Sequence, residues 1–296
     1  MIKGINQFMF PDSIPLEEAF SIAKQSGYDA FELCMGLDDF QPFSYIEDPL
    51  GIVFYKNPLF NINSSEKEIL RVKSMASEQG IKVSSVGSIL SFLVYPLNDN
   101  DPIVRQKSID CIKKSIDAAA LLEAESVLVI PGAVTEKVDY LDAYKRAQES
   151  LCILGEYASK HKVTIAVENV WNCFLYSPIE MARFIDEINN PWVGIYLDVG
   201  NMLVMGYPDQ WIKLYQHRLK RLHIKDFRRS IGNINGFVSM FDGDVDWDKV
   251  MSALLEIGYD GEWTAEIIPA SKDYKHTIKQ TANAIDTIFE RKVIKK

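Results

Sequence analysis

The sequence predicts an α/β protein in which eight parallel strands and eight helices form a (β/α)8 TIM barrel, with its active site at the carboxyl ends of the strands. Short apolar runs alternate with longer amphipathic stretches eight times along the chain. The 296 residues, 47% of them hydrophobic, suffice for one large core, so we expect a single domain over residues 1–296. Each of the last four apolar runs also carries, at or near its carboxyl end, a residue that can bind a metal ion.

The strands are predicted where apolar and β-branched residues gather in short runs bounded by turn residues. Eight such runs are expected at residues 2–9, 30–33, 81–86, 126–130, 163–168, 193–198, 221–225 and 262–267. No GxGxxG follows the first run, and no GxxxxGK[ST] occurs in the sequence, which weighs against an open nucleotide-binding sheet. The count of eight therefore favours a closed barrel.

The helices are predicted where apolar residues recur three and four positions apart. They are expected at residues 15–26, 64–79, 102–122, 141–161, 178–188, 208–215, 246–257 and 274–292. Ser64 and Asp246 are expected N-caps, and Gly27, Gly80 and Gly258 are expected stops. Residues 38–61 are rich in Pro, Gly and aromatic residues and predict a long loop, of the kind that often covers an active site.

Charge and cysteine usage exclude several classes of protein. The net charge of -9 and the pI of about 5.1 argue against binding to nucleic acid or to an anionic membrane. Four scattered cysteines without a CxxC pair indicate reduced thiols rather than a disulfide framework. The first residues lack the apolar segment of a signal peptide, and no apolar run reaches about 18 residues. We therefore expect a soluble, cytoplasmic protein.

Four strand ends carry candidate metal ligands: Glu168, Asp198, His223 and Glu266. Each taken alone has an ordinary structural explanation, such as a helix cap or a surface ion pair. Four on successive strands favour one divalent metal ion, because buried carboxylates need a compensating charge. The predominance of oxygen ligands and the absence of a thiolate favour Mn²⁺, with Mg²⁺, Co²⁺ or Zn²⁺ as alternatives.

Six motifs resemble the xylose-isomerase-like barrel superfamily of sugar and sugar-phosphate isomerases and epimerases. They are GYDAFEL (27–33), VENVWN (167–172), YLDVGN (196–201), HIKDF (223–227), GDVDW (243–247) and TAEI (264–267). The chain is most similar to the ketose 3-epimerases of that group. The resemblance implies that Glu168, Asp198, His223 and Glu266 bind one metal ion. It also implies that the two glutamates form the catalytic acid–base pair, and that the protein is a homodimer or homotetramer.

The implied reaction begins with removal of a weakly acidic proton beside a ketone. The metal stabilises the resulting enediolate, one glutamate acts as the base, and the other returns a proton to the opposite face. We therefore expect an epimerase or isomerase that acts on a ketose or ketose phosphate. An aldose–ketose isomerisation would use the same groups, so the residues alone do not separate the two reactions.

Several further residues are expected to bind the substrate. Arg229, six positions after His223, occupies a spacing at which the resembling epimerases contact substrate oxygens. Lys225 is expected to anchor a phosphate or hydroxyl groups. Glu32, at the end of the second strand, either binds substrate or forms an ion pair at the rim. Trp171 either stacks on the sugar or packs under a loop.

Two positions depart from the family pattern. Asn201 stands where the family often has a His, three residues after the metal-binding Asp, and is expected to bind substrate without titrating. Phe174 stands where the epimerases of free ketoses carry a further Glu. Both differences weigh against a free ketose as the substrate and leave the metal ligands unchanged.

Other functions stay open. Dehydration of a keto-inositol starts with the same proton abstraction, and a non-catalytic sugar-binding barrel would keep the pocket without turnover. An apurinic-site endonuclease of the same superfamily needs several strand-end histidines, whereas this chain has four His in total and one at a strand end. That scarcity and the acidic pI weigh against a nuclease.

Overall fold

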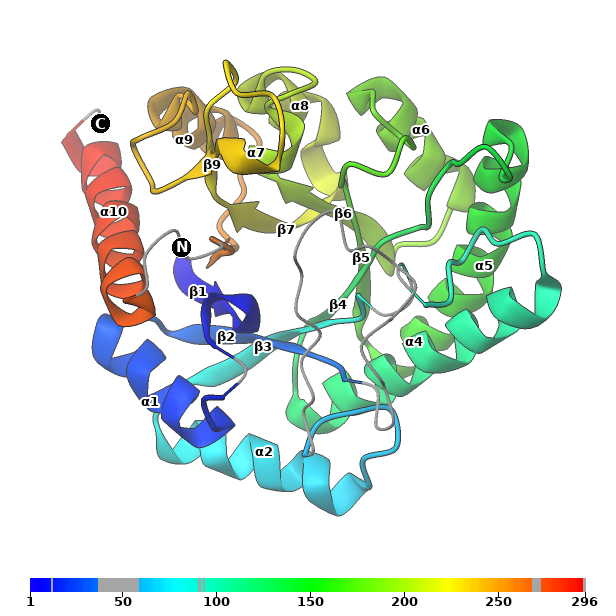
Figure 1. The fold of residues 1–296 in the computed structure, drawn as a ribbon, viewed down its shortest axis with the longest axis horizontal. Coiled ribbons are helices and arrows are strands. Elements are labelled where there is room, and N and C mark those ends of the chain that lie inside the picture. Colours follow the sequence, from blue (N-terminus) through cyan, green and yellow to red (C-terminus); the bar gives the residue numbers. More distant parts are fainter. Residues whose placement is uncertain (12, 37–58, 90–91, 93, 268–272, 295–296) are drawn as a thin grey trace.

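Eight parallel strands close into a barrel in the computed structural model of the chain, in the order β1-β10-β7-β6-β5-β4-β3-β2 (Figure 1). The structure describes residues 1–294 except 12, 37–58, 90–91, 93 and 268–272. The barrel strands are β1 (Ile2–Asn6), β2 (Ala30–Cys34), β3 (Lys82–Gly87), β4 (Ser126–Val129), β5 (Thr164–Glu168), β6 (Val193–Asp198), β7 (Leu219–Ile224) and β10 (Glu262–Ala265). The predicted fold class is confirmed.

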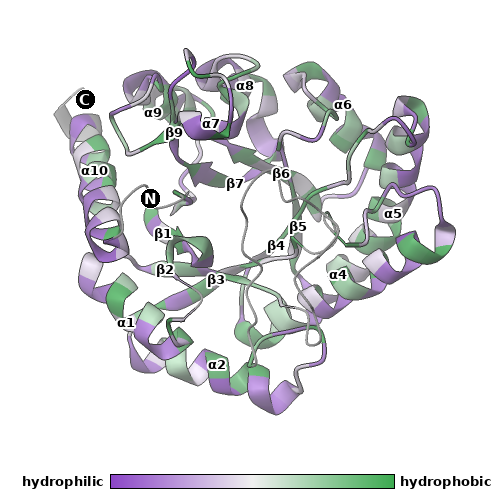
Figure 2. Cartoon of the chain, viewed as in Figure 1, coloured by the Kyte–Doolittle hydropathy of each residue, from purple (hydrophilic) through white to green (hydrophobic). Residues whose placement is uncertain are grey.

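Helices connect successive strands and surround the barrel (Figure 1). They are α1 (Leu16–Ser26), α2 (Glu66–Glu78), α4 (Pro102–Leu122), α5 (Tyr140–His161), α6 (Pro178–Ile188), α8 (Pro208–Tyr215), α9 (Trp247–Glu256) and α10 (Tyr274–Ile294). Figure 2 shows hydrophilic and hydrophobic residues interspersed along them, as expected for helices with one face on the barrel and one in water. Within the described part of the chain, no helix is both long and apolar enough to span a membrane.

The helix ends agree with the predicted caps except at α2. Asp246 caps α9 by accepting a hydrogen bond from Lys249 N, and Gly27 ends α1 at a φ of 96°. The prediction of Ser64 as the cap of α2 was wrong. Ser65 is the cap and forms a reciprocal capping box with Glu68. The Ser64 hydroxyl instead accepts from Asn61 N and donates to Leu59 O, which shapes the preceding turn.

Several short elements differ from the predicted ones. The first strand ends at Asn6, because the Asn6 side chain accepts a hydrogen bond from Phe8 N and turns residues 7–9 into a 3-10 helix. The short elements absent from the prediction are η1 (Gln7–Met9), α7 (Val199–Met202), η2 (Gln216–Arg218), β8 (Asp226–Phe227), η3 (Ile234–Gly236) and β9 (Phe237–Val238). Most of the predicted loop over residues 38–61 lies outside the described residues.

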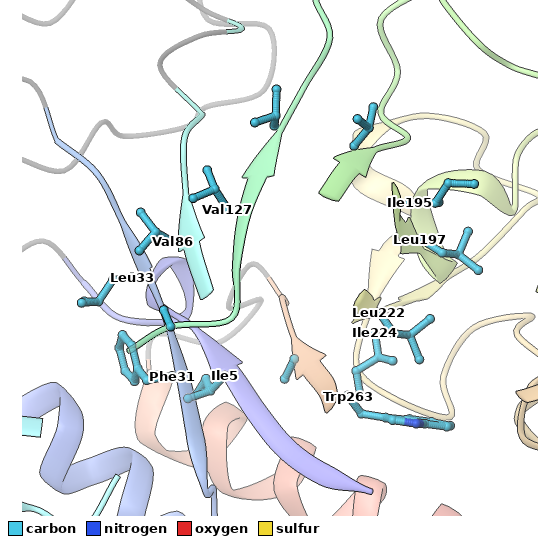
Figure 3. Packing of buried hydrophobic residues seen from close by; sticks show 14 of the residues in the cluster. Ile5, Phe31, Leu33, Val86, Val127, Ile195, Leu197, Leu222, Ile224 and Trp263 are labelled. Carbon is cyan, nitrogen blue, oxygen red and sulfur yellow. The ribbon is translucent and has the colours of Figure 1, made fainter. Parts of the chain in front are cut away.

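Strand alternation separates two kinds of barrel residue. Apolar side chains on one face of each strand belong to the main hydrophobic core, and Figure 3 shows Ile5, Phe31, Leu197, Leu222 and Trp263 among them. The alternate residues point into the barrel, where a separate small apolar cluster is formed by Leu128, Ile130, Ala166 and Tyr196. The inward positions also carry most of the polar strand residues. These polar side chains therefore lie near the barrel axis.

The amino-terminal end of the barrel is filled by a buried ion pair. Arg221 Nη1 lies 3.0 Å from Glu262 Oε2, and the same guanidinium donates to Ser126 Oγ at 2.9 Å and to Ser84 O at 2.7 Å. Gly4 makes room for this pair, because a Cβ at that position would lie 2.0 Å from Glu262 Oε1. We call this group, Arg221 with Glu262, Ser84 and Ser126, the barrel floor.

A short antiparallel pair, β8 and β9, extends from the opposite end of the barrel after β7. The buried Asp226 carboxylate holds this segment together. It accepts hydrogen bonds from Phe227 N, Phe241 N, Val245 N and Trp247 Nε1, at 2.9 to 3.2 Å. All four donors belong to residues 227–247, so this carboxylate organises the loop that follows β7.

Candidate metal centre

Four side chains meet at the carboxyl end of the barrel, one from each of four neighbouring strands. Glu168 ends β5, Asp198 ends β6, His223 lies in β7, and Glu266 follows β10. One ligand atom from each lies within 4.8 Å of the others. These are the four metal ligands expected from the sequence, and the fold brings all of them together.

The histidine ring has one side toward the carboxylates. His223 Nδ1 lies 3.0 Å from Glu168 Oε1, 3.6 Å from Glu266 Oε2 and 3.9 Å from Asp198 Oδ2. The Tyr196 ring lies against the imidazole, with 4.2 Å between the ring centroids. The ring is fully buried, so packing as well as hydrogen bonding fixes its orientation.

A network of asparagines fixes the aspartate ligand. Asp198 N donates to Asn169 Oδ1 at 2.9 Å, and Asn169 Nδ2 donates to Asp198 O at 3.1 Å. Asn201 N donates to Asp198 Oδ1 at 2.8 Å, while Asn201 Nδ2 donates to Asn169 O at 3.1 Å. Asn201 therefore supports β5 and β6 through its own hydrogen bonds. Contact between Asn201 and a substrate stays a prediction.

Burial and neighbouring charges shift the pKa values of Glu168, Asp198 and His223. Burial, together with the charges of Glu266 and Asp198, raises the pKa of Glu168 to about 7 against the opposing effect of His223. Burial also raises the pKa of Asp198, although the Lys225 ammonium opposes it. Burial by itself would lower the pKa of His223, but the surrounding carboxylates raise it well above its usual value. The site thus favours positive charge.

Lys225 supplies part of that positive charge. Its ammonium lies 2.6 Å from both Asp198 Oδ2 and Glu266 Oε2, and 5.0 Å from the centre of the Phe237 ring. Although burial opposes its charged form, the carboxylates of Asp198 and Glu266 raise the pKa of Lys225. The residue named from the sequence as a substrate anchor therefore lies among the ligands rather than on the surface.

Glu32 lies beneath the histidine. It is fully buried and its Oε1 lies 2.7 Å from His223 Nε2 and 2.6 Å from Asn6 Nδ2. Burial would raise the pKa of Glu32, but the charge and hydrogen bonds of its neighbours, His223 first, hold that pKa below its usual value. Of the two roles expected from the sequence, the ion pair is the one that matches these contacts, although it forms in the interior rather than at the rim.

The contacts found for Arg229 and Trp171 are with residues other than the four ligands. The Arg229 guanidinium lies over the exposed Tyr207 ring, 4.7 Å from its centre. Trp171 donates from Nε1 to Asn201 O at 2.7 Å and stacks on Phe237, with 5.3 Å between centroids. Trp171 thus packs against the β8–β9 segment. Substrate contact by Arg229 or Trp171 stays a prediction.

Sequence reasoning missed Asn6, and it did not foresee the hydrogen bonds between Asn169 and Asp198. Asn6 ends β1, fully buried, and Asn169 directly follows β5. The signal that identified the ligands, a polar residue at a strand end, applies to both residues. Phe174, noted as a departure from the family, is buried in an aromatic cluster with Tyr140 and Phe184.

The donor set fits a divalent metal ion. An imidazole nitrogen and three carboxylate oxygens converge, and each of the four can offer a lone pair to a cation. One His with three carboxylates suits Mn²⁺, Mg²⁺, Co²⁺ or Zn²⁺ and does not select among them. The structure therefore supports a metal centre and leaves the identity of the metal to experiment.

The chain belongs to the xylose isomerase-like TIM barrel family, whose sequence model matches residues 20–285. It is 23% identical over 269 residues to a putative L-ribulose-5-phosphate 3-epimerase, SgbU, of Haemophilus influenzae, covering 89% of this chain and 87% of the relative. It is 22% identical over 265 residues to the L-ribulose-5-phosphate 3-epimerase UlaE of Escherichia coli, covering 89% and 86%.

Solved structures share the fold at low sequence identity. A D-tagatose 3-epimerase-like protein superposes with a TM-score of 0.77 at 18% identity, over 98% of this chain and 99% of the other. An L-ribulose 3-epimerase gives 0.76 at 17% identity, over 99% and 96%. An IolI protein with a bound zinc atom gives 0.76 at 18% identity, over 98% and 99%. These similarities establish the barrel and no more.

Proposed function

We propose that this protein is a divalent-metal-dependent 3-epimerase of a ketose phosphate. The observation that carries the proposal is the pair of glutamates, Glu168 and Glu266, that converge from β5 and β10 on one cluster with Asp198 and His223. A planar intermediate between two carboxylates is the minimum arrangement for inverting one carbon. The relatives named as 3-epimerases support this choice over an aldose–ketose isomerase.

Each proton transfer has a residue to perform it. One glutamate takes the C3 proton, and the electron pair of the broken C–H bond moves into the C2 carbonyl to give an enediolate. The other glutamate then delivers a proton to the opposite face of C3. A divalent ion bound by the four ligands would supply positive charge beside the developing oxyanion. After turnover one glutamate has gained a proton and the other has lost one, so both must exchange with solvent.

A phosphorylated substrate is supported by two observations. The curated relatives that match nearly the whole chain are named for a ketose 5-phosphate. Lys225, nearly buried beside the ligands, offers an ammonium that can bind a phosphate or the hydroxyl groups of the sugar. In our proposal Arg229 and Asn201 contact further substrate oxygens, and Trp171 borders the sugar. In the same proposal Glu32 does not contact the substrate and instead forms a hydrogen bond with His223 from beneath the ring.

The proposed metal is Mn²⁺, because oxygen donors predominate. A homodimer or homotetramer also remains part of the proposal, on the family resemblance stated above. Both can be measured on the purified protein, by metal analysis and by sedimentation.

The decisive experiment is hydrogen exchange followed by NMR. Mn²⁺-activated protein is incubated in D₂O with L-ribulose 5-phosphate, its unphosphorylated form, other ketoses and a keto-inositol. We expect deuterium at C3 of the phosphate ester, with inversion. Label at C1 or C2 with formation of an aldose would make the protein an isomerase. Loss of water from the keto-inositol would make it a dehydratase. Absence of exchange despite a bound metal would leave a sugar-binding barrel.

A further inference from the structure

We propose that Glu32 and Asn6 are positioning residues that hold the His223 proton on Nε2 and thereby turn the Nδ1 lone pair toward the metal. The inference rests on the metal site proposed above and extends it to two residues that would bind neither metal nor substrate. It follows from the direction of three hydrogen bonds, which can be worked out from one backbone group.

The backbone N–H of Phe8 fixes the orientation of the Asn6 amide. Phe8 N lies 2.7 Å from Asn6 Oδ1, and a backbone N–H can only donate. The atom facing it must be the amide oxygen, so the orientation of the Asn6 amide is determined. Asn6 Nδ2 is therefore a donor, and it lies 2.6 Å from Glu32 Oε1. Glu32 Oε1 is consequently an acceptor.

The same oxygen determines which nitrogen of the His223 ring carries a proton. Glu32 Oε1 lies 2.7 Å from His223 Nε2. If Nε2 carried no proton, its lone pair would face an oxygen that already accepts from Asn6, in a fully buried location. Such a contact is repulsive, so the proton must lie on Nε2. In the neutral ring, Nδ1 then carries the lone pair.

Nδ1 faces the other ligands and lies 3.0 Å from Glu168 Oε1, the contact that a bound metal ion would replace. Nδ1 is the ring atom that lies within 4 Å of oxygens from Glu168, Glu266 and Asp198. A carboxylate that orients a metal-binding histidine in this way fixes both its tautomer and its ring direction. Buried Glu32 is placed to do so here, 191 residues from His223 in sequence.

Asn6 also acts on a second ligand. Its Nδ2 lies 3.3 Å from Glu266 Oε1, while Glu266 Oε2 is the oxygen that faces His223 Nδ1. One amide thus binds the far oxygen of Glu266 and the carboxylate behind His223. The strand end of β1 thereby links two ligands contributed by β7 and by the segment after β10.

The test compares two substitutions at Glu32 with a matched control. Glu32→Gln keeps an oxygen that can accept from Nε2, whereas Glu32→Leu removes it. Glu262→Gln makes the same chemical change at another buried carboxylate of the barrel, in the barrel floor. Mn²⁺ affinity is measured by calorimetry. The Nε2–H signal is observed by NMR of ¹⁵N-histidine-labelled protein, with and without Zn²⁺, and His223→Gln identifies the signal among four histidines.

We expect wild type to show a downfield Nε2–H signal and, with Zn²⁺, a metal-bound Nδ1. Glu32→Leu should lose that signal and bind Mn²⁺ about 10- to 100-fold more weakly. Glu32→Gln should keep the signal and bind with intermediate affinity, and Glu262→Gln should bind as wild type does. A purely structural role for Glu32 would leave the Nε2 proton in place in every folded variant.

Three results would overturn the inference. They are an Nε2 without a proton in wild type, wild-type Mn²⁺ affinity in Glu32→Leu, or an equal loss of affinity in Glu262→Gln. Failure of wild type to bind either metal would instead remove the proposed function. In that case the Nε2–H signal of the metal-free protein still tests whether Glu32 holds the proton.

Discussion

The ligand residues are the part of the site that the sequence predicts best. Glu168 and Asp198 each end a nearly continuous apolar run, and a carboxylate at the end of such a buried strand stands out in the sequence. The role of Glu32 did not follow, although its position at a strand end was noted. Its partner, His223, lies across the barrel, and no local pattern encodes a contact between distant strands.

The two glutamates give the first prediction at this scale. Glu168→Gln and Glu266→Gln should each lower the rate of epimerisation by roughly 10²- to 10⁴-fold, because an amide cannot transfer the C3 proton. Rates are measured by NMR in D₂O, and metal content is measured for each variant so that rates refer to metal-loaded chains. A variant that keeps both its metal and the wild-type rate would exclude that glutamate as acid or base.

Lys225 gives the second prediction at the scale of residues. If its ammonium binds the phosphate, Lys225→Gln should raise KM for the phosphorylated ketose by about tenfold or more and change KM for the free sugar far less. Lys220→Gln is the control, because Lys220 lies in β7, the strand that Lys225 directly follows, and donates to His217 O. Equal changes in KM for both substrates would indicate that Lys225 serves the metal ligands instead.

At the scale of elements, long periodic segments were predictable and short ones were not. The bounds predicted for α4, α6 and α8 are those observed, since each has a Pro near its start and a regular apolar face. The strands β8 and β9 have two residues each, and no period can be read from two residues. They form because the Asp226 carboxylate accepts hydrogen bonds from residues as far along the chain as Trp247, 21 positions away.

The third prediction concerns that aspartate. Asp226→Asn replaces an acceptor of four hydrogen bonds with a group that also donates, so it should lower the free energy of unfolding by about 1 to 3 kcal/mol. Denaturant unfolding measures the change. Asp242→Asn, at an exposed position in the same loop, should have little effect. Equal stability of Asp226→Asn and wild type would show that this carboxylate does not hold the loop.

For the whole molecule, counting strands was enough to predict closure, because eight strand–helix units form a barrel by curling one sheet until its edges pair. The pairing of β1 with both β2 and β10 confirms it. The filling of the barrel was not predictable. Arg221 was read as the start of a strand, and its pairing with Glu262 depends on barrel closure.

The fourth prediction is at this scale too. A cation that joins three carboxylates, two of them buried, stabilises the folded chain, and ligand at 100 times its Kd contributes about 2.7 kcal/mol. Mn²⁺ should therefore raise the melting temperature by several degrees, measured calorimetrically at constant ionic strength. Asp198→Asn should abolish most of the increase. An equal increase in that variant would indicate that Mn²⁺ binds elsewhere.

The barrel floor affects how substrate enters and product leaves the enzyme. Within the described residues, Arg221, Glu262, Ser84 and Ser126 fill the amino-terminal end of the barrel, so under the proposed function we expect the sugar to approach the ligands from the opposite end. A sugar that enters and its epimer that leaves must use the same route, and they differ at one carbon. Under the proposed function, the product should compete with the substrate for the same site. The net direction of epimerisation is then set by the reaction that consumes the product.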